Sequence, residues 1–486
     1  MLFNSDLFIF LFLPLTLLGW FLLNHLKQYR LAETFLLGMS LWFYSYFHLN
    51  YLWIILASIA GNFLISLILE YKKHPVFMWA GILYNLGLLF YFKYFDFFLE
   101  NLNLLFPSAE FVLRGILMPL GISFFTFQQL SYIIDRAKGE APHYPFLLYA
   151  NFVTFFPQLI AGPIVMHREL VPQLTDLTKR IPTKEGFASG IERFVLGLSK
   201  KVLLADPLSM VVDYGFDKVW YLDTVSAIVA VFTYAFQMYF DFSGYCDMAI
   251  GIGRMFNIRL PENFNSPYKS ESIQEHWQRW HMTLTRFFTQ YVYFPLGGSR
   301  KGQFRTILNI LLVFLLSGLW HGANWTFVVW GLLQGIACVF NRKGFFRRLP
   351  GALKTIGTFT YFSLSMAVFR SDNLSLALEM FRHIFTPAWT GFITELASAF
   401  NLSEAYVFVQ ALTLKAPGLL PVFYLCLFGL WFVVSVLILK GKNAAALGAE
   451  HEEKGYGKGY ALLLAALFAW SVISLSKAGP FLYFNF

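Results

Sequence analysis

The chain has 486 residues, of which 57% are hydrophobic, 20% are aromatic and only 13% are charged; roughly a quarter of the residues are charged in soluble domains. This composition excludes a disordered chain, a collagen-like chain and a disulfide scaffold, because apolar residues dominate and only three cysteines are present. The 37 lysines and arginines exceed the 28 acidic residues and give a net charge of +9, which in so apolar a chain we assign to basic loops on the cytoplasmic side of a membrane.

Long uncharged runs predict many membrane helices, because about 20 apolar residues span a bilayer and a lone strand cannot satisfy its backbone there. We expect an all-α polytopic membrane protein with roughly ten to thirteen transmembrane or re-entrant helices. The runs are residues 7–24, 35–47, 51–69, 76–92, 115–134, 146–166, 224–240, 306–320, 324–340, 355–369, 418–439 and 460–476.

The distribution of basic residues between short loops predicts the orientation of the chain. Lysine and arginine follow the first and third runs, at 27–30 and 72–73, whereas the loop 99–110 has none. Two later basic loops cover residues 342–348 and 440–458. This pattern places both chain ends outside the cytoplasm.

Residues 146–166 lie between two basic loops and contain Pro157 and Pro163, so we interpret them as a re-entrant hairpin. The next segment, 186–206, has an apolar face, and Glu192, Arg193 and Lys200 lie off that face. It is typical of an amphipathic helix in the membrane interface, although docking against other cytoplasmic loops fits the pattern equally well.

Residues 241–305 interrupt the apolar pattern with polar groups set among aromatic residues. We expect this segment to enter the membrane partly and to line a polar cavity with irregular backbone. Four of its polar side chains either line that cavity or make structural hydrogen bonds: Asp241, Ser243, Asp247 and Asn265.

Two histidines are the main candidates for chemistry. His321 lies at a helix break directly after a long uncharged run, and His281 lies in the more polar segment. A buried histidine at the edge of a bilayer is costly unless it has a partner or a function. The spacing of His276 and His281 does not suit a metal site, and no nucleophile motif is present. General base catalysis, in which neutral imidazole takes a proton from an alcohol, remains.

At these residues the chain resembles the membrane-bound O-acyltransferase family, within it the bacterial branch that contains the alginate O-acetyltransferase membrane subunit. The resemblance extends over nearly the whole chain. Its motifs are MLFNSDLFIFLFLPL at 1–15, MPLGISFFTFQQLSYIID at 118–135, FFPQLIAGPI at 155–164, DFSGYCDMAIGIGRMF at 241–256, NFNSPY at 263–268, WQRWHMTLTRF at 277–287, PLGG at 295–298, GLWHGANWTFVVWG at 318–331 and LYFNF at 482–486.

The resemblance implies one membrane domain, residues 1–486, whose helices form a ring around a central polar tunnel. Its parts would be N-terminal spans (1–134), a re-entrant and interfacial segment (135–223), a catalytic core (224–340) and C-terminal spans (341–486). His321 would be the family's essential histidine and His281 its second polar position. Side chains that would position substrate or stabilise the oxyanion are His281, Trp277, Trp320, Asn324 and Trp325. For the tryptophans, packing alone is the alternative and the more frequent role. Family members often carry Arg-Asp where this chain has Thr289-Gln290.

The implied activity is transfer of an acyl group, most simply acetyl, from a cytoplasmic thioester to a hydroxyl of an extracytoplasmic polysaccharide or of a partner protein. We expect acetyl-CoA or an acyl-carrier thioester as co-substrate, and no bound cofactor or metal. We also expect an extracytoplasmic acyltransferase as partner, contact with membrane lipids, a location in the bacterial plasma (inner) membrane and no nucleic-acid binding. D-alanyl transfer to teichoic acid, fatty-acyl transfer to lipid or protein, and transport of a polar solute are the alternatives.

Overall fold

The computed structural model describes residues 1–342, 344, 348–477 and 479–482, and over these residues the chain is helical, with one isolated antiparallel bridge between Phe264 and Trp280. Seven of the described helical segments are long and apolar enough to cross a membrane. The predicted all-α polytopic membrane fold is therefore confirmed. The seven segments are Phe8–His25, Asn50–Tyr71, Pro75–Leu105, Thr224–Met255, Gln303–His321, Pro417–Lys440 and Lys458–Ser476.

The other predicted segments form helices that are shorter or less apolar. Helix α6 (Ile122–Lys138) begins later than the run 115–134 because Gly121 adopts a left-handed conformation directly before it. Pro157 divides the run 146–166 into α7 (Phe146–Thr154) and α8 (Phe156–Leu159). Neither helix is long enough to cross a bilayer, and the re-entrant path itself stays a prediction.

The described chain divides into two compact units, each of which is discontinuous in sequence. Unit 1 comprises Met1–Phe194, Cys246–Glu262 and Arg286–Tyr291. Unit 2 comprises Val195–Tyr245, Asn263–Thr285 and Val292–Phe486. The four functional segments inferred from the sequence stay a prediction. Lys343, Arg347 and residues 483–486 of the closing motif lie outside the described residues.

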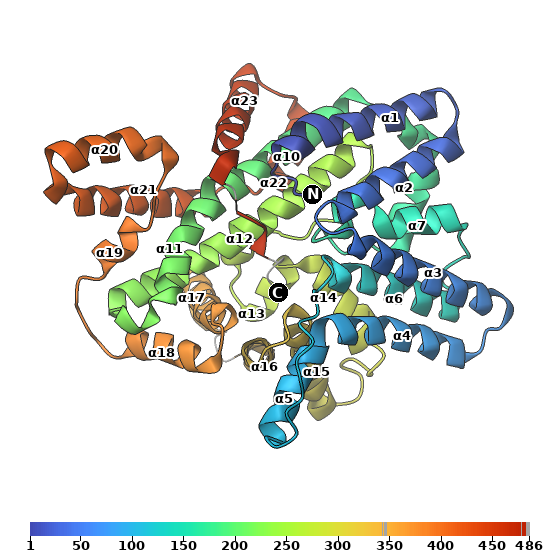
Figure 1. Cartoon of the computed structure of the whole chain (residues 1–486), viewed down its shortest axis with the longest axis horizontal. Helices are drawn as coiled ribbons and strands as arrows, with labels where there is room; N and C mark the ends of the chain where they lie inside the picture. The colour runs from blue at the N-terminus through green and yellow to red at the C-terminus, as the bar shows by residue number, and fades with distance from the viewer. Residues whose placement is uncertain (343, 345–347, 478, 483–486) are drawn as a thin grey trace. The chain divides into compact units, whose positions relative to one another are not determined.

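Unit 1 is built mainly from the N-terminal helices. Helices α1 (Leu13–His25) and α2 (Tyr29–Ser45) lie side by side, and α4 (Pro75–Leu89) packs on α6 (Figure 1). The remaining elements that bear on this unit are α3 (Asn50–Tyr71), α5 (Phe95–Leu105), α9 (His167–Thr175) and α10 (Lys184–Ser199).

Helix α10 buries the two charged side chains in its middle, although the sequence suggests an amphipathic helix with its charges facing water. Glu192 and Arg193 are both buried. The Arg193 guanidinium donates to Asp247 at 2.7 Å and to Glu262 at 2.5 Å. These partners offset the cost of burying the charge, and α10 is thus docked within unit 1.

Unit 2 contains both candidate histidines. The long helix α12 begins at Thr224 in unit 2 and continues to Met255, with its residues from Cys246 onward in unit 1, whereas the sequence predicts irregular backbone from Asp241. The helix continues because its acidic side chains have charged partners: Asp241 pairs with Lys201, and Asp247 pairs with Arg193. The prediction of irregular backbone is therefore wrong for residues 241–255, and the lining of a cavity by their side chains stays a prediction.

The other helices of unit 2 lie before and after α12 in the chain (Figure 1). Helix α21 (Leu420–Lys440) exposes Leu430, Val433 and Leu437 by 54% or more, which suits a lipid-facing surface. The elements are α11 (Asp206–Asp217), α13 (Ile273–Arg279), α14 (Met282–Phe288), α15 (Gln303–His321), α16 (Trp325–Arg342), α17 (Gly351–Arg370), α18 (Leu374–Phe385), α19 (Ile393–Ser398), α20 (Tyr406–Lys415), α22 (Ala444–Lys454) and α23 (Lys458–Ile473).

Candidate active site

His321 is the last residue of α15 and is 3% exposed. Its Nδ1 lies 2.6 Å from the carbonyl oxygen of Ser317, one helical turn earlier. Because a carbonyl oxygen only accepts, Nδ1 carries the proton of the neutral ring and Nε2 carries the lone pair. Helix α15 thus holds His321 in the tautomer that a general base needs at Nε2.

Three aromatic rings surround the His321 imidazole in edge-to-face contacts. The ring centroids lie 5.0 Å away for Trp320, 5.0 Å for Trp330 and 5.5 Å for Phe369. These rings come from α15, α16 and α17, so tertiary packing fixes the orientation of the imidazole.

The close approach of α15 and α16 depends on glycines. A Cβ atom on Gly318 would meet the carbonyl oxygen of Phe327, and one on Gly331 would meet the carbonyl oxygen of Phe314. Small residues let helix backbones approach in membranes. This packing brings Trp330 against His321 at the end of α15.

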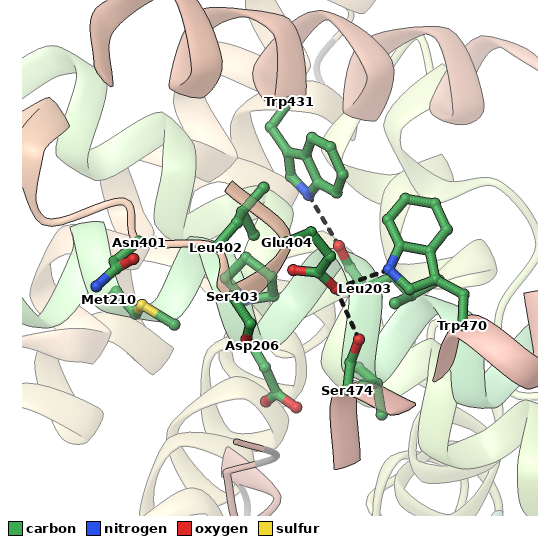
Figure 2. A pocket seen from close by; sticks show the side chains of 12 residues that line it. Leu203, Asp206, Met210, Asn401, Leu402, Ser403, Glu404, Trp431, Trp470 and Ser474 are labelled. Atoms are coloured by element: carbon green, nitrogen blue, oxygen red, sulfur yellow. Dashed lines mark hydrogen bonds between the residues drawn. The ribbon is translucent and has the colours of Figure 1, made fainter. Parts of the chain in front are cut away.

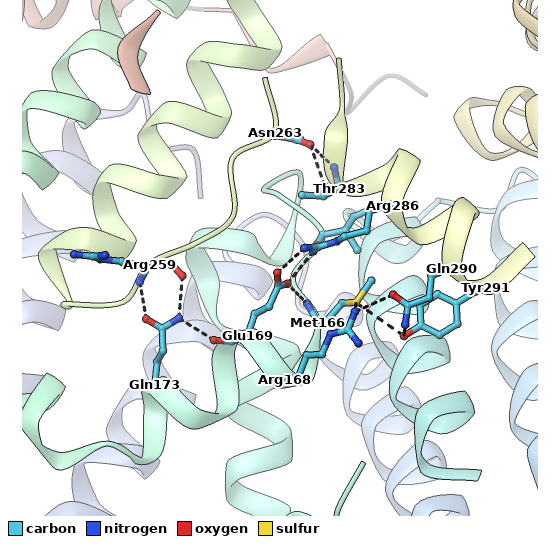
Figure 3. Close-up of polar contacts among 11 residues, drawn as sticks. Met166, Arg168, Glu169, Gln173, Arg259, Asn263, Thr283, Arg286, Gln290 and Tyr291 are labelled. Atoms are coloured by element: carbon cyan, nitrogen blue, oxygen red, sulfur yellow. Dashed lines mark hydrogen bonds and ion pairs between the residues drawn. The ribbon is translucent and has the colours of Figure 1, made fainter. Parts of the chain in front are cut away.

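His281 lies at the turn between α13 and α14, is fully buried and has a left-handed φ of 45°. Its Nδ1 lies 3.2 Å from Asn263 Oδ1, which also accepts from the Thr283 amide at 3.2 Å and the Thr283 hydroxyl at 3.0 Å (Figure 3). The Thr283 amide can only donate, so this atom is an oxygen and Nδ1 of His281 carries the proton. Left-handed backbone in a residue other than glycine costs energy and is common at functional sites.

The structure brings the two histidines together through Trp320, whose ring contacts both imidazoles; its centroid lies 5.8 Å from that of His281. Burial, and secondarily the nearby His321, hold the pKa of His281 well below its usual value. His281 is therefore neutral at physiological pH. Two buried imidazoles that contact one tryptophan ring are an arrangement for proton transfer or hydrogen bonding with a substrate hydroxyl.

Other candidate residues lie at varying positions relative to the histidines. Trp277 is buried with its ring 5.7 Å from that of Trp330. Ser243 is buried, and its hydroxyl has no hydrogen-bond partner among the described residues. Trp277 and Ser243 are therefore both placed to line the site, and their roles in substrate binding stay predictions.

Three further candidates make other contacts. Asn324 accepts from the Thr326 amide and donates to the Asp372 carbonyl, so it shapes the turn into α16. Trp325 is 50% exposed. Asn265 is exposed and accepts a hydrogen bond from Asn443. Their described hydrogen bonds do not bring these residues to either histidine.

Sequence reasoning did not select Asn263 as a site residue. The asparagine lies in NFNSPY, together with Asn265, and the motif alone does not distinguish the residue that meets His281 from the one that meets Asn443. The signal that could have found Asn263 is the adjacency of NFNSPY and WQRWHMTLTRF, since the Phe264–Trp280 bridge pairs these two segments.

The Thr289-Gln290 departure lies in unit 1, beside α9. Gln290 Oε1 accepts from the Arg168 guanidinium at 2.9 Å, and nearby Arg286 pairs with Glu169 at 2.5 Å (Figure 3). A neutral amide thus bonds the arginine where a carboxylate would make an ion pair.

A separate pocket in unit 2 is lined by side chains from α11, α21, α23 and the turn around Glu404 (Figure 2). Trp470 Nε1 and Ser474 Oγ both donate to Glu404 at 2.7 and 2.8 Å, and Trp431 Nε1 donates to the Leu203 carbonyl. Neither histidine lines this pocket. Among the described residues, no group of three or more histidine, cysteine or acidic side chains could hold a metal ion.

Comparison with known proteins gives consistent similarities. A sequence profile of the membrane-bound O-acyltransferase family matches residues 117–350. The chain is 38% identical to the peptidoglycan O-acetyltransferase of Helicobacter pylori, over all of this chain and 98% of that protein. It is 36% identical to the probable alginate O-acetylase AlgI of Azotobacter vinelandii over the full length of both. The teichoic acid D-alanyltransferase of Bacillus subtilis is 28% identical over 47% of this chain and 60% of that protein.

Proposed function

Because this chain belongs to the membrane-bound O-acyltransferase family and is an O-acyltransferase, we propose that it moves an acetyl group from a cytoplasmic thioester toward an extracytoplasmic acceptor. The acceptor is a hydroxyl of a polysaccharide or of a partner protein. The full-length similarity to an alginate O-acetylase and a peptidoglycan O-acetyltransferase supports acetyl as the group and a polysaccharide as its destination.

The single observation that carries the proposal is the hydrogen bond from His321 Nδ1 to the Ser317 carbonyl. It leaves the lone pair on Nε2, which takes the proton of the acceptor hydroxyl. The hydroxyl oxygen attacks the thioester carbonyl carbon, the carbon–sulfur bond breaks, and the imidazolium returns its proton to the departing thiolate. His321 ends the cycle neutral.

His281 has a positioning role in this scheme. Its Nδ1 proton is directed to Asn263, so its Nε2 is an acceptor and not a donor for an oxyanion. A neutral acceptor beside the general base suits a hydrogen bond from a second hydroxyl of the polysaccharide, which orients the attacking hydroxyl toward His321. Trp277, Trp320 and Ser243 are the candidates for lining the substrate path.

Acetyl-CoA or an acyl-carrier thioester supplies the acyl group, and an extracytoplasmic acyltransferase receives it where a partner completes the modification. We place the protein in the bacterial plasma membrane with both chain ends outside. The seven apolar segments support a multi-pass membrane protein; the basic loops inferred from the sequence support the orientation.

The test compares His321→Ala with His276→Gln in a strain that lacks its own copy of the enzyme. His276 is an equally buried histidine whose Nδ1 also bonds a carbonyl, that of Pro267. Base-labile acetate on exported polysaccharide is measured per amount of membrane-inserted protein. We expect loss of acetate for His321→Ala and retention for His276→Gln; acetate at the wild-type level in both variants would contradict the base assignment.

D-alanyl transfer is the second candidate, supported by the shorter match to teichoic acid D-alanyltransferases. Membranes supplied with labelled acetyl-CoA or with a D-alanyl carrier thioester distinguish the two donors. A polar-solute transporter would instead show flux in liposomes without consumption of either donor.

A further inference from the structure

A buried group of three charges lies in unit 2 and takes no part in the proposed chemistry. The ammonium group of Lys201 lies 2.6 Å from Asp241 Oδ1 and 2.7 Å from Asp206 Oδ1. The three side chains are at most 10% exposed. Burial, and secondarily the charge of Asp241, raise the pKa of Asp206 to about 7 although Lys201 acts in the opposite direction. We call Lys201, Asp206 and Asp241 the charge clamp.

The charge clamp binds the backbone of the C-terminal segment Gly479–Leu482. The Lys201 ammonium donates to the Pro480 carbonyl oxygen at 3.1 Å. The Leu482 amide donates to the second oxygen of Asp241 at 3.0 Å. These bonds join positions 279 and 241 residues apart in the chain, so they fix the segment on the long helix α12 and on the helical turn before α11.

Between these two anchors, Phe481 is 2% exposed and contacts the aromatic side chains of α12. Its ring stacks on Tyr245, with centroids 4.6 Å apart and planes at 27°, and lies 5.8 Å from the ring of Phe242. Phe242 in turn makes an edge contact with the His281 imidazole at 4.7 Å. One ring therefore separates the C-terminal segment from the candidate active site.

The chemistry of the clamp favours a positioning role over simple stabilisation. A buried ion pair adds little net stability compared with apolar side chains of the same shape, because both charges lose their hydration. The ion pair instead fixes the position of the bound backbone, since charged hydrogen bonds tolerate little displacement of the backbone groups that they hold. Apolar contacts alone would anchor the segment without fixing its register.

We propose that residues 479–482 are a positioning element of the acyl-transfer site, held by Lys201 and Asp241 so that Phe481 supports Phe242 against His281. The inference rests on the proposed function. The left-handed His281 has two supports in this arrangement: Asn263 fixes its Nδ1, and Phe242 with Phe481 behind it fixes the face of its ring.

The experiment compares Phe481→Ala with Phe400→Ala in membranes supplied with labelled acetyl-CoA. Phe400 is an equally buried phenylalanine of unit 2 that contacts Phe428 and Trp431 instead of the rings near His281. We expect Phe481→Ala to lower kcat by about tenfold or more per folded enzyme with little change in KM for acetyl-CoA. The reason is that the His281 imidazole loses its orientation beside the general base. Phe400→Ala should keep the wild-type kcat per folded enzyme.

A second pair of variants tests the clamp. The triple variant Lys201→Met/Asp206→Asn/Asp241→Leu replaces all three charges by uncharged side chains of similar shape, which avoids leaving one buried charge unpaired. Hydrogen–deuterium exchange in the triple variant should be faster at the amides of Phe481 and Leu482, together with the same loss of kcat as in Phe481→Ala. Lys201→Arg keeps the positive charge and should restore most of the activity.

Two outcomes would overturn the inference: a kcat of Phe481→Ala equal to that of Phe400→Ala, or rapid exchange at the amides of Phe481 and Leu482 with wild-type kcat in the triple variant. If the proposed function itself is wrong, the measurements give a different result. In that case the wild type transfers no acetyl group, or His321→Ala transfers it at the wild-type rate.

Discussion

Replacing Asn263 by alanine should both destabilise the protein and slow acyl transfer. One oxygen, Asn263 Oδ1, accepts from His281 Nδ1, the Thr283 amide and the Thr283 hydroxyl, at 3.0 to 3.2 Å. A buried donor left without an acceptor costs about 1 to 3 kcal/mol. At the lower bound, three donors give a loss of about 3 kcal/mol in the free energy of unfolding. His281 also loses the bond that fixes its tautomer, so kcat should fall about tenfold or more.

The assay pairs thermal unfolding in nanodiscs with acetyl transfer per folded enzyme. Asn263→Asp keeps the acceptor oxygens and should recover most of the stability, but its charge raises the pKa of His281 and activity should stay low. Asn265→Ala, two residues along and exposed, should change the stability by less than about 0.5 kcal/mol. Wild-type unfolding together with wild-type kcat in Asn263→Ala would refute Asn263 as the residue that organises His281.

Three further perturbations test other parts of the structure. Gly318→Ala places a Cβ against a carbonyl oxygen of α16 and should cost about 1 to 3 kcal/mol in thermal unfolding, whereas Gly357→Ala, with open space around it, should cost nothing. Burial lowers the pKa of His276 to about 3. Below about pH 6.5 only the unfolded chain binds a proton at this residue, so the free energy of unfolding should fall by about 1.4 kcal/mol per pH unit on acidification from 6.5. Unfolding curves at pH 5 and 7 should show that His276→Gln removes this contribution to the pH dependence. Gln290→Asp turns the bond with Arg168 into a surface ion pair and should change the stability by less than about 1 kcal/mol; a larger shift in the unfolding midpoint would mean that this contact is more buried than the structure shows.

The sequence predicts the helical membrane fold and the position of His321 well because both depend on local pattern. The uncharged run 306–320 matches α15, and the following Gly322 marks the break at which His321 lies. A histidine at the end of a long apolar run is visible without any tertiary information. The apolar spans that end at charged loops are likewise visible without any tertiary information.

The partners of the polar residues were not predictable because they are distant in the chain. Asp241 pairs with Lys201, forty residues earlier, and with the Leu482 amide, 241 residues later. Without those contacts, the acidic residues of α12 suggested irregular backbone in a polar cavity. Their ion pairs explain why the helix instead continues to Met255.

The most direct test of the account is the rate of labelled acetyl transfer from acetyl-CoA by His321→Ala in membranes, with folded enzyme quantified in each sample. General base catalysis contributes about 10²- to 10⁴-fold to such reactions. We predict a loss of at least about 10²-fold in kcat for His321→Ala while His276→Gln keeps the wild-type value. Transfer at the wild-type rate by folded His321→Ala would contradict the central claim that Nε2 of His321 is the base.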